Sequence, residues 1–402
     1  MKRGSKSPRI LYVTQFWPHG PAIGAQLRSL NVLRALQQVG NVEVVVLDDG
    51  ALAPATGGSE FKVAYSLAIK KWPDRGFVGK LRWTLDPRYH YPNGWGVEGE
   101  AMRRILESLA SVDMVWFHKL RSPDLFPSAS WPASVVDIDD VPSTYEHAIL
   151  RLRYGPVARL LTQRKIFALQ RREKLLGERF TLLAVCSEED SEYLKRTGVK
   201  APIHVIPNAF ERPRVDPVHK PVEPTRIGFI GTFDYFPNTE GIHWFVNECW
   251  RRIKAKLPNA RLRLVGRGSD SPLAPTGPDV DSLGWLGDPS GEISTWTVMV
   301  VPIRVGAGTR IKIAQAFSQK CPVVSTSSGA HGYQLPDRSN MYVADTAAAF
   351  ADACVRATRE PVETAQMADR AWRRFLETWT WDAIRPRVWA AVEDCLRRRA
   401  IA

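Results

Sequence analysis

Short hydrophobic runs alternate with amphipathic and polar stretches along the first half of the chain. The runs RILYV, VEVVVLD, VDMVWF, ASVVDI and TLLAVC are each too apolar for a strand with one exposed face. Between the first two runs, Val32, Leu36 and Val39 lie at helical spacing and Gly40 is a natural stop, which predicts a helix over 25–39. Buried strands that alternate with helices predict a parallel sheet covered on both faces.

A proline-dense stretch then interrupts this pattern. The segment IPNAFERPRVDPVHKPVEPT shows no apolar period, and we interpret 209–225 as a semi-rigid linker. The linker separates a first domain over 1–208 from a second domain over 226–380. A closing helix over 381–402 could pack back on the first domain.

The alternation restarts after the linker. RIGFIG, RLRLVG, TVMVVP, CPVVS and MYVA predict strands, and NTEGIHWFVNECWRRIKAKL and TRIKIAQAFSQ predict helices. The predicted fold class is α/β, with two facing Rossmann-like, doubly wound domains and a cleft between them. Ligands of such sheets bind beyond the carboxyl ends of the strands, so we expect the site in that cleft.

Composition narrows the class of protein. A chain of 402 residues suits two domains. Apolar runs stay below the ~18 residues of a membrane-spanning helix, and the start does not resemble a secretory signal, so we expect a cytoplasmic protein. The five cysteines are widely spaced in apolar sequence, which predicts buried thiols rather than disulfides or a zinc site. The net charge of +13 favours an anionic partner.

The segment VPIRVGAGTRIKIAQAF, residues 301–317, joins a buried strand to a basic helix start. Gly306 and Gly308 let the backbone turn tightly, and Thr309 is the expected cap of the helix that follows. The first N–H groups of that helix attract an anion, for which Arg310 offers a planar fork and Lys312 a mobile charge. We interpret the segment as a phosphate site. The alternative is a surface helix start with two solvated bases.

These residues carry a resemblance to a known family. PIRVGAGTRIKIAQAFSQKCPVVSTSSGAHGY resembles the donor-binding segment of retaining glycosyltransferase family 4, the group 1 glycosyltransferases. GFIGTFDYFPNTEGIHWF, RLRLVGRGSD, SLGWLGD and TWTWDAI fit the same family in the same order, whereas the first domain agrees more loosely. The resemblance implies the GT-B fold, a nucleotide diphosphate sugar as donor, and metal-independent transfer of a hexosyl group with retention. A UDP- or GDP-sugar is the expected co-substrate, with no further cofactor.

The resemblance also implies site residues. His118, Arg310 and Lys312 are the candidate catalytic residues, and His118 would point at the transferred sugar. The candidate residues for the donor diphosphate and nucleoside are Gly24, Gly231, Thr232, Gly266, Arg267, Gly284, Trp285, Gly308, Thr309, Arg310, Lys312 and Gln315.

Two positions depart from the family pattern. Relatives commonly carry two glutamates eight positions apart here, where this chain has Ala307 and Gln315. Gln315 could still accept one ribose hydrogen bond, although without charge assistance. Weaker donor binding, an altered preference and lost activity therefore all stay open.

Two further segments suggest partners. In DIDD, residues 137–140, we interpret Asp139 and Asp140 as a cleft edge on the acceptor side rather than as a metal site. Residues 151–174 contain eight basic residues and one acidic residue. As one helix they could lie on an anionic membrane and present the first domain to a lipid-linked or growing saccharide, or they could form a long solvated helix.

Other functions compete with glycosyl transfer. An NDP-sugar epimerase can share this architecture, but it would need a carboxylate pair that the sequence does not suggest. An oxidoreductase would need a G-x-G-x-x-G loop, whereas the first loop offers only Gly20 and Gly24. A degenerate, non-catalytic member that binds nucleotide remains open because of Gln315. Nucleic-acid binding is not expected, since the chain shows no recognisable module for it.

Overall fold

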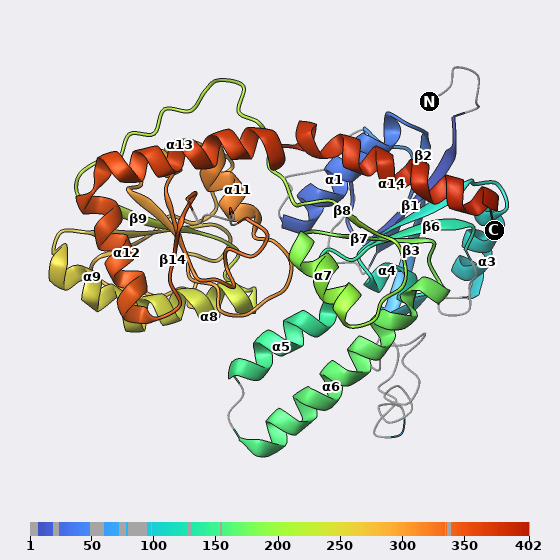
Figure 1. The fold of residues 1–402 in the computed structure, drawn as a ribbon, viewed down its shortest axis with the longest axis horizontal. Helices are drawn as coiled ribbons and strands as arrows, with labels where there is room; N and C mark the ends of the chain where they lie inside the picture. Colours follow the sequence, from blue (N-terminus) through green and yellow to red (C-terminus); the bar gives the residue numbers. More distant parts are fainter. Residues whose placement is uncertain are drawn as a thin grey trace. The chain divides into compact units, whose positions relative to one another are not determined.

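The computed structural model describes residues 7–18, 24–48, 60–71, 78, 95–97, 99–126, 131–152, 155–333, 335 and 339–401. The chain divides into two compact units, each with its own core and its own sheet, in which the strands are mainly parallel (Figure 1). Unit 1 comprises Met1–Pro207 with Ile384–Ala402, and unit 2 comprises Asn208–Ala383. Two Rossmann-like α/β units are thus confirmed.

The sheet of unit 1 has the strand order β4-β3-β2-β1-β5-β6-β7-β8, in which only the β3–β4 pair is antiparallel among the described strands. The order reverses direction between β1 and β5, which is where ligands of such sheets bind. Its strands are β1 (Arg9–Thr14), β2 (Asn41–Asp48), β3 (Val63–Lys71), β4 (Trp95–Val97), β5 (Met114–His118), β6 (Ala133–Asp137), β7 (Leu182–Val185) and β8 (Ile203–Val205).

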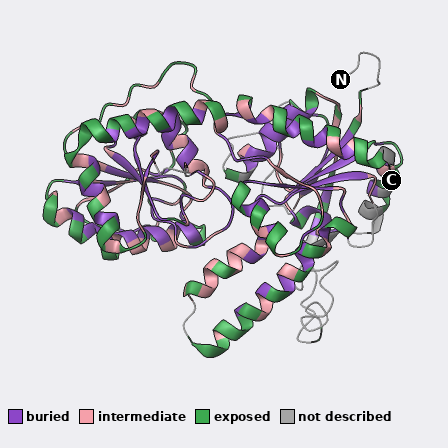
Figure 2. Ribbon diagram, viewed as in Figure 1, coloured by how far each residue is buried: buried purple, intermediate pink, exposed green. Residues whose placement is uncertain are grey.

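The central strands of unit 1 are buried on both faces. Every residue from Ile10 to Val13 and from Met114 to Phe117 is fully buried, as the continuous apolar runs predict (Figure 2). The helices that flank the sheet are α1 (Gly24–Gln37), α3 (Gly99–Leu109), α4 (Arg121–Asp124), α5 (Pro142–Leu152), α6 (Pro156–Lys174) and α7 (Glu188–Arg196), with a 3₁₀ turn at Leu175–Glu178. The predicted helix over 25–39 corresponds to α1.

The basic stretch 151–174 is not one helix, which corrects the sequence-based expectation. Helix α5 ends at Leu152 and α6 begins at Pro156, after Gly155 with a φ of 97°. Glycine adopts this left-handed backbone at little cost, and proline suits the first helical position because its missing N–H would have no partner there. The two helices pack side by side as a hairpin (Figure 1).

Unit 2 has the strand order β11-β10-β9-β12-β13-β14, with all neighbouring pairs parallel. Its direction reverses between β9 and β12. Its strands are β9 (Arg226–Ile230), β10 (Arg261–Val265), β11 (Val280–Ser282), β12 (Val298–Val301), β13 (Val323–Ser325) and β14 (Tyr342–Val343). Its helices are α8 (Phe236–Trp244), which continues through a π-helical turn (Phe245–Trp250) into α9 (Arg251–Lys256), then α10 (Ser290–Ile293), α11 (Ile311–Ser318), α12 (Ala347–Arg359) and α13 (Pro361–Thr378).

The proline-dense stretch is hydrogen-bonded to unit 2. Phe210 N–H donates to the Trp379 carbonyl, and Lys220 N–H and Val222 N–H donate to the carbonyls of Ser294 and Thr295. Helix α14 (Trp381–Ile401) follows, and from Ile384 onward it belongs to unit 1, where the Trp389 indole donates to the Ala35 carbonyl at 2.9 Å.

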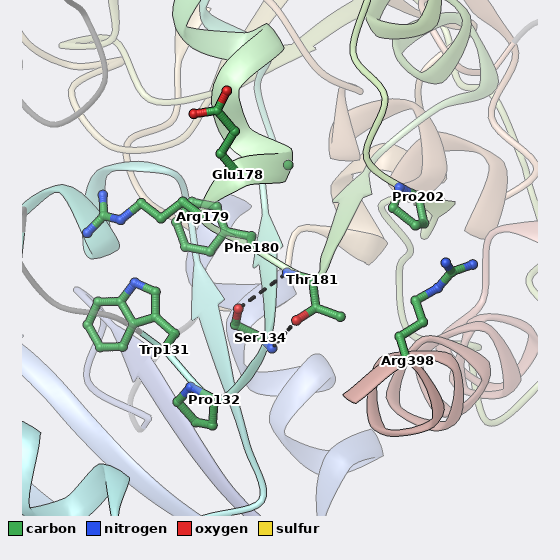
Figure 3. A pocket seen from close by; sticks show the side chains of 10 residues that line it. Trp131, Pro132, Ser134, Glu178, Arg179, Phe180, Thr181, Pro202 and Arg398 are labelled. Carbon is green, nitrogen blue, oxygen red and sulfur yellow. Dashed lines mark hydrogen bonds between the residues drawn. The ribbon is translucent and has the colours of Figure 1, made fainter. Parts of the chain in front are cut away.

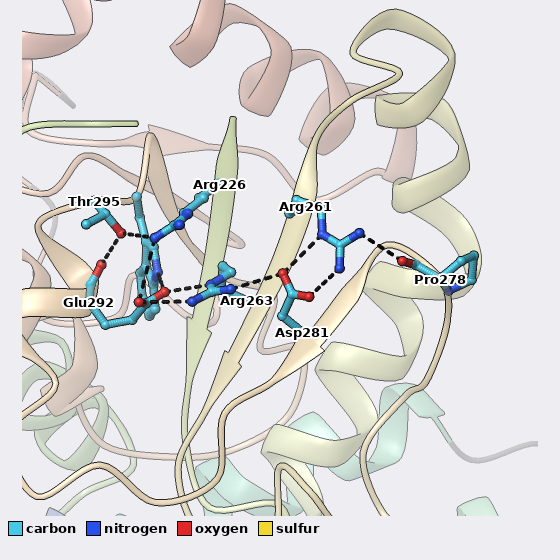
Figure 4. A network of polar contacts seen from close by, with 8 residues as sticks. Arg226, Arg261, Arg263, Pro278, Asp281, Glu292 and Thr295 are labelled. Atoms are coloured by element: carbon cyan, nitrogen blue, oxygen red, sulfur yellow. Dashed lines mark hydrogen bonds and ion pairs between the residues drawn. The ribbon is translucent and has the colours of Figure 1, made fainter. Parts of the chain in front are cut away.

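Three arginines of unit 2 are paired within a polar network near the start of its strands (Figure 4). Arg263 contacts Glu292 at 2.7 Å and Asp281 at 3.1 Å, and Arg261 pairs with the same Asp281. Arg226 reaches Thr295 at 3.0 Å. The guanidiniums hold the pKa of Asp281 below its ordinary value through hydrogen bonds, so these arginines stabilise the fold and are not available to an anionic ligand.

All five cysteines are free and buried, which confirms the prediction of buried thiols. Within the described part of the chain, no helix is both long and apolar enough to cross a membrane.

Candidate active site

Three loops meet at the carboxyl edge of the unit 2 sheet. Gly231 follows β9 and donates its N–H to the Val265 carbonyl at 3.0 Å. Gly266 follows β10 with a φ of 121°, and a Cβ there would lie 2.1 Å from the Gly231 carbonyl oxygen. Position 266 therefore requires glycine, and its loop approaches the Gly231 backbone more closely than a side chain at 266 would allow. Gly284, which precedes Trp285 in the loop after β11, joins this contact, because its carbonyl accepts a hydrogen bond from Gly266 N–H at 2.8 Å.

Lys312 lies against the first of these loops. Its Nζ donates to Asn238 Oδ1 at 2.8 Å and lies 4.1 Å from the centroid of the Phe229 ring. A Cβ on Gly231 would be 3.0 Å from the same Nζ, so the ammonium faces the backbone at the end of β9. Burial lowers the pKa of Lys312 well below its ordinary value, and the positive charge of Arg310 lowers it further.

Arg310 precedes α11 and has hydrogen-bond donors without acceptors. Its Nη1 donates to the Ala307 carbonyl, and its Nη2 packs so closely on Gly306 that a Cβ there would be 2.3 Å away. Its Nε and Nη2 are buried and have no hydrogen-bond partner among the described residues. Each buried unpaired donor costs about 1–3 kcal/mol, so these donors point to a missing anionic acceptor.

Thr309 does not cap α11, which corrects the sequence-based expectation. The residue that flanks the helix start is Arg310, with no side-chain cap, and Thr309 Oγ1 is buried without a hydrogen-bond partner in the described structure. Because the helix begins at Ile311, the Thr309 hydroxyl lies one residue too early to reach the first free N–H groups. The first turn of α11 thus has neither a side-chain cap nor an acidic residue.

The two faces of α11 divide as the sequence predicts. Ile313, Ala316 and Phe317 are buried in the core of unit 2, whereas Lys312 and Gln315 are half-buried on the other side. Gln315 makes no side-chain hydrogen bond with any described residue. Lys312 and Arg310 likewise have no carboxylate partner among the described residues, in contrast to the paired arginines of the network. The site of unit 2 therefore carries an uncompensated positive charge.

The outer loops of this site are more exposed. Arg267 pairs with Asp234 at 3.0 Å, and both side chains are more than half exposed. The side chain of Trp285 is 50% exposed, which is unusual for a tryptophan that only fills a core. Thr232 presents its carbonyl to Asn238 Nδ2 at 2.9 Å, and this bond orients the amide whose oxygen holds Lys312.

In unit 1, His118 ends β5 beside the point where the strand order reverses. The ring is fully buried, with Nδ1 3.4 Å from Thr14 Oγ1 and the edge of Phe16 at a centroid distance of 5.5 Å. Its Nε2 is buried without a partner among the described residues. Burial lowers the pKa of His118 to about 3, so the imidazole is neutral at physiological pH.

Gly24 begins α1 at the same edge of the unit 1 sheet. Its φ is 35°, and a Cβ there would meet no atom within 4 Å. Gly20 lies outside the described residues.

The aspartates of DIDD differ in burial and in their contacts, although Asp139 and Asp140 both lie near Lys119 Nζ, at 3.1 and 3.9 Å. Asp137 forms a fully buried, two-pronged ion pair with Arg28, with contacts of 2.7 and 2.9 Å. Asp139 is buried, accepts from the Cys186 thiol at 3.2 Å and pairs with Lys119 at 3.1 Å, whereas Asp140 is exposed. No group of three or more potential metal ligands occurs within the described parts of the chain.

Sequence reasoning did not identify Arg28, Asn238 or Thr14. Arg28 lies in the middle of α1 and meets Asp137 across 109 residues of sequence, so no local pattern reveals the pair. Asn238 follows Pro237 in the first turn of α8. A proline in the first turn is typical of a helix start, and this pattern could have drawn attention to Asn238 in the sequence.

A hollow of about 510 Å³ lies at the opposite edge of the unit 1 sheet, where β6 and β7 begin (Figure 3). Ser134 and Thr181 in its wall form two hydrogen bonds with each other. Ser134 N–H donates to Thr181 Oγ1 at 3.1 Å, and Thr181 N–H donates to Ser134 Oγ at 3.4 Å. It lies at the other ends of the strands from His118 and therefore is not part of the site described above.

Comparison with known proteins finds a family match for unit 2. Residues 224–360 match the family model described as Glycosyl transferases group 1. No curated protein matches the sequence.

Solved structures show the fold of the whole chain. Sucrose-phosphate synthase from Thermosynechococcus elongatus is 14% identical, with 97% of this chain and 99% of that chain covered and a TM-score of 0.67. HepE of Anabaena, in complex with UDP and glucose, is 14% identical over 96% and 99% of the two chains, with a TM-score of 0.65. WaaG, a glycosyltransferase involved in lipopolysaccharide biosynthesis, is 12% identical over 95% and 98%, with a TM-score of 0.62. The predicted resemblance to group 1 glycosyltransferases with a GT-B fold is confirmed.

Proposed function

We propose that the protein transfers a glycosyl group from a nucleotide diphosphate sugar to a hydroxyl of a saccharide acceptor. The observation that carries this proposal is the uncompensated pair of cations at the start of α11, where Arg310 has buried donors without acceptors. A diphosphate would supply those acceptors and would meet the free N–H groups of the first turn of α11. Lys312 would add a second charge-assisted contact.

The chemistry that these residues support is stabilisation of a leaving group. The bond between the anomeric carbon and the diphosphate oxygen breaks while a bond to the acceptor oxygen forms, and the acceptor proton passes to the departing diphosphate. Arg310 and Lys312 would stabilise the negative charge that grows on that diphosphate in the transition state. Attack on the same face of the sugar gives retention, and we propose that no metal takes part.

We further propose roles for the surrounding residues. Gly231, Gly266 and Gly308 bring backbone close to the diphosphate, whereas Trp285 and Gln315 contact the nucleoside. In unit 1 we propose that the neutral ring of His118 offers Nε2 to a sugar hydroxyl. Gly24 would permit close approach at the start of α1.

The co-substrate is proposed to be a UDP- or GDP-sugar. UDP is favoured because the solved structures of HepE, which share the fold, include complexes with UDP and with UDP-glucose. A lipid-linked or growing saccharide is the proposed acceptor, by analogy with WaaG and its involvement in lipopolysaccharide biosynthesis.

One experiment tests this function. The purified protein is incubated with UDP-, GDP-, ADP- and dTDP-sugars, with and without a mixture of simple saccharide acceptors, and the released nucleotide is measured. We expect release from one class of donor, stimulated by acceptor and reduced at least tenfold in Arg310→Gln. Arg251→Gln, an exposed position on α9, is the matched control and should retain full activity.

A second candidate function rests on Gln315, which stands where relatives commonly carry glutamate. A non-catalytic member would bind one nucleoside diphosphate through Arg310 and Lys312 but would release no nucleotide from any donor sugar. If the protein bound no nucleoside diphosphate and released no nucleotide from any donor sugar, both proposals would be contradicted.

A further inference from the structure

A polar contact joins the first turn of α8 to the first turn of α11, across 74 residues of sequence. Asn238 is 8% exposed, its Nδ2 donates to the Thr232 carbonyl at 2.9 Å, and its Oδ1 accepts from Lys312 Nζ at 2.8 Å. A backbone carbonyl can only accept a hydrogen bond, and an ammonium can only donate one. These two neighbours therefore fix the orientation of the amide, with its oxygen toward Lys312.

The loop after β9 holds Asn238 in place without help from Lys312. Asn238 N–H donates to the Tyr235 carbonyl at 2.9 Å, and Tyr235 N–H donates to the Thr232 carbonyl at 3.3 Å. The same Thr232 carbonyl accepts from the amide of Asn238, so the loop and the side chain are tied to one another. The amide oxygen is therefore a fixed acceptor, toward which the flexible side chain of Lys312 is drawn.

Gly231 leaves the space that this contact occupies. A Cβ at position 231 would lie 2.9 Å from Asn238 Nδ2 and 3.0 Å from Lys312 Nζ. Contacts of that length are too short for a methyl group, so a larger residue would push the amide and the ammonium out of their places. The end of β9 therefore brings together a glycine, an oriented amide and an ammonium.

The acceptor for Lys312 is neutral, in contrast to the acceptors of two other lysines of unit 2. Lys254 pairs with Asp279 at 3.0 Å, and Lys256 pairs with Asp352 at 2.6 Å. An amide oxygen orients an ammonium as a carboxylate does, but it adds no negative charge. A hydrogen bond to the charged form also opposes the effect of burial, which lowers the pKa of Lys312. Lys312 is thus directed by a group that leaves its charge uncompensated.

We propose that Asn238 is a positioning residue of the donor site, which directs the ammonium of Lys312 toward the diphosphate and leaves its positive charge to that ligand. Asn238 acts through Lys312 and makes no contact with the sugar or the nucleoside. A diphosphate oxygen would accept from one of the two N–H groups of the ammonium that Asn238 does not use. An acidic residue at position 238 would instead compete with the phosphate for that ammonium. This inference rests on the proposed function, because it assigns a task within the site of unit 2.

A double-mutant cycle tests whether Asn238 acts through Lys312. The full-length parent protein, Asn238→Ala, Lys312→Met and the double variant are titrated calorimetrically with UDP and UMP, and in parallel with GDP and GMP. Asn238→Asp is added because it keeps the size of the side chain and replaces the NH₂ group by a charged oxygen. Asn259→Ala and Asn259→Asp are the matched controls, since Asn259 is exposed in the turn before β10. Urea unfolding checks that each variant is folded.

We expect Asn238→Ala to weaken binding of the diphosphate about fivefold in the parent protein, because one oriented hydrogen bond contributes about that factor. In the Lys312→Met background the same substitution should change the Kd by less than about twofold. Binding of the monophosphate should stay the same, because the second phosphate is absent. Asn238→Asp should weaken diphosphate binding about tenfold or more, since its carboxylate pairs with Lys312 and repels the phosphates. The Asn259 variants should bind like the parent protein.

Three results would overturn this inference alone. An equal loss from Asn238→Ala with and without Lys312 would show that Asn238 acts on the ligand or on the fold by itself. Unchanged diphosphate affinity of Asn238→Asp would show that the neutrality of the acceptor has no effect. An equal loss of monophosphate and diphosphate binding would show a structural role. In each case the parent protein would still bind the diphosphate, so the proposed function would stand. If the parent protein bound neither UDP nor GDP, the proposed function would be contradicted, and this inference with it.

Discussion

Replacement of Lys312 by methionine should stabilise the empty protein while it weakens nucleotide binding. Methionine keeps the length of the side chain and its apolar stem but removes the ammonium. In the empty protein that ammonium is held by Asn238 Oδ1 at 2.8 Å and by the Phe229 ring at 4.1 Å, without a carboxylate among the described residues. Burial and the charge of Arg310 both lower its pKa, so the folded state disfavours the charge.

The magnitudes follow from the contacts. Loss of the hydrogen bond and of the cation–π contact costs about 1 kcal/mol each, whereas taking an ammonium out of water costs several kcal/mol. The free energy of unfolding of the empty protein should therefore rise by about 1 kcal/mol or more. Loss of a charge-assisted bond to phosphate should cost about 1.5–3 kcal/mol of binding, or about 10- to 150-fold in Kd.

Two measurements on the same variant decide the matter. Urea unfolding without ligand gives the change in stability, and calorimetric titration with UDP gives the change in Kd. Lys320→Met is the control, since its ammonium lies 3.6 Å from Asp369 and 5.8 Å from the Trp372 ring. A loss of stability in Lys312→Met with unchanged UDP affinity would refute the reasoning, because Lys312 would then be a structural residue.

Three further outcomes are expected. The pKa of His118 is lowered to about 3, so below about pH 6.5 the unfolded chain binds a proton at this residue whereas the native state does not. The free energy of unfolding should therefore fall as the pH drops, by about 2–3 kcal/mol between neutral pH and pH 4.5. In urea unfolding, His118→Gln should lack this part of the pH dependence. Gly228→Ala would place a Cβ 2.0 Å from the buried ring of Trp296 and should lower stability by about 3 kcal/mol or more in thermal unfolding. Gly291→Ala, where a Cβ would meet no atom within 4 Å, should change stability little. Equal effects of the two substitutions would show that the sheet moves to accommodate the added methyl group. Gln315→Glu should tighten UDP binding about fivefold if it meets the ribose, and a gain of the same size for 2′,3′-dideoxy-UDP would exclude that contact.

The sequence predicted the parallel strands because they are buried on both faces. Residues 10–13 and 114–117 form continuous apolar runs, and a short run of this kind is typical of a strand in a parallel sheet that is covered on both faces. Strand β3 was not predicted, since its described side chains alternate between buried and exposed, with Leu67 and Ile69 buried around an exposed Ala68. Strand β11 has three residues and no buried side chain, so it leaves no pattern in the sequence.

The glycines and bases of the unit 2 site were found because they lie close together in sequence. The cap assigned to Thr309 was wrong because a one-residue shift of the helix start cannot be predicted from propensity. The break between α5 and α6 at Gly155 was not predicted, because residues 151–174 were interpreted from their charge and not from their turn residues. Asn238 and Arg28 depend on contacts between distant segments, 74 and 109 residues from their partners, and tertiary structure alone brings those groups together.

The central claim is that unit 2 holds a diphosphate at the start of α11. The most direct test is calorimetric titration of the full-length protein with UDP and with UMP, repeated on Arg310→Gln. Arg310 and Lys312 should each contribute through the added phosphate, so UDP should bind at least tenfold more tightly than UMP, and that ratio should collapse in the variant. Equal affinities for UDP and UMP, or a ratio that survives in Arg310→Gln, would contradict the assignment.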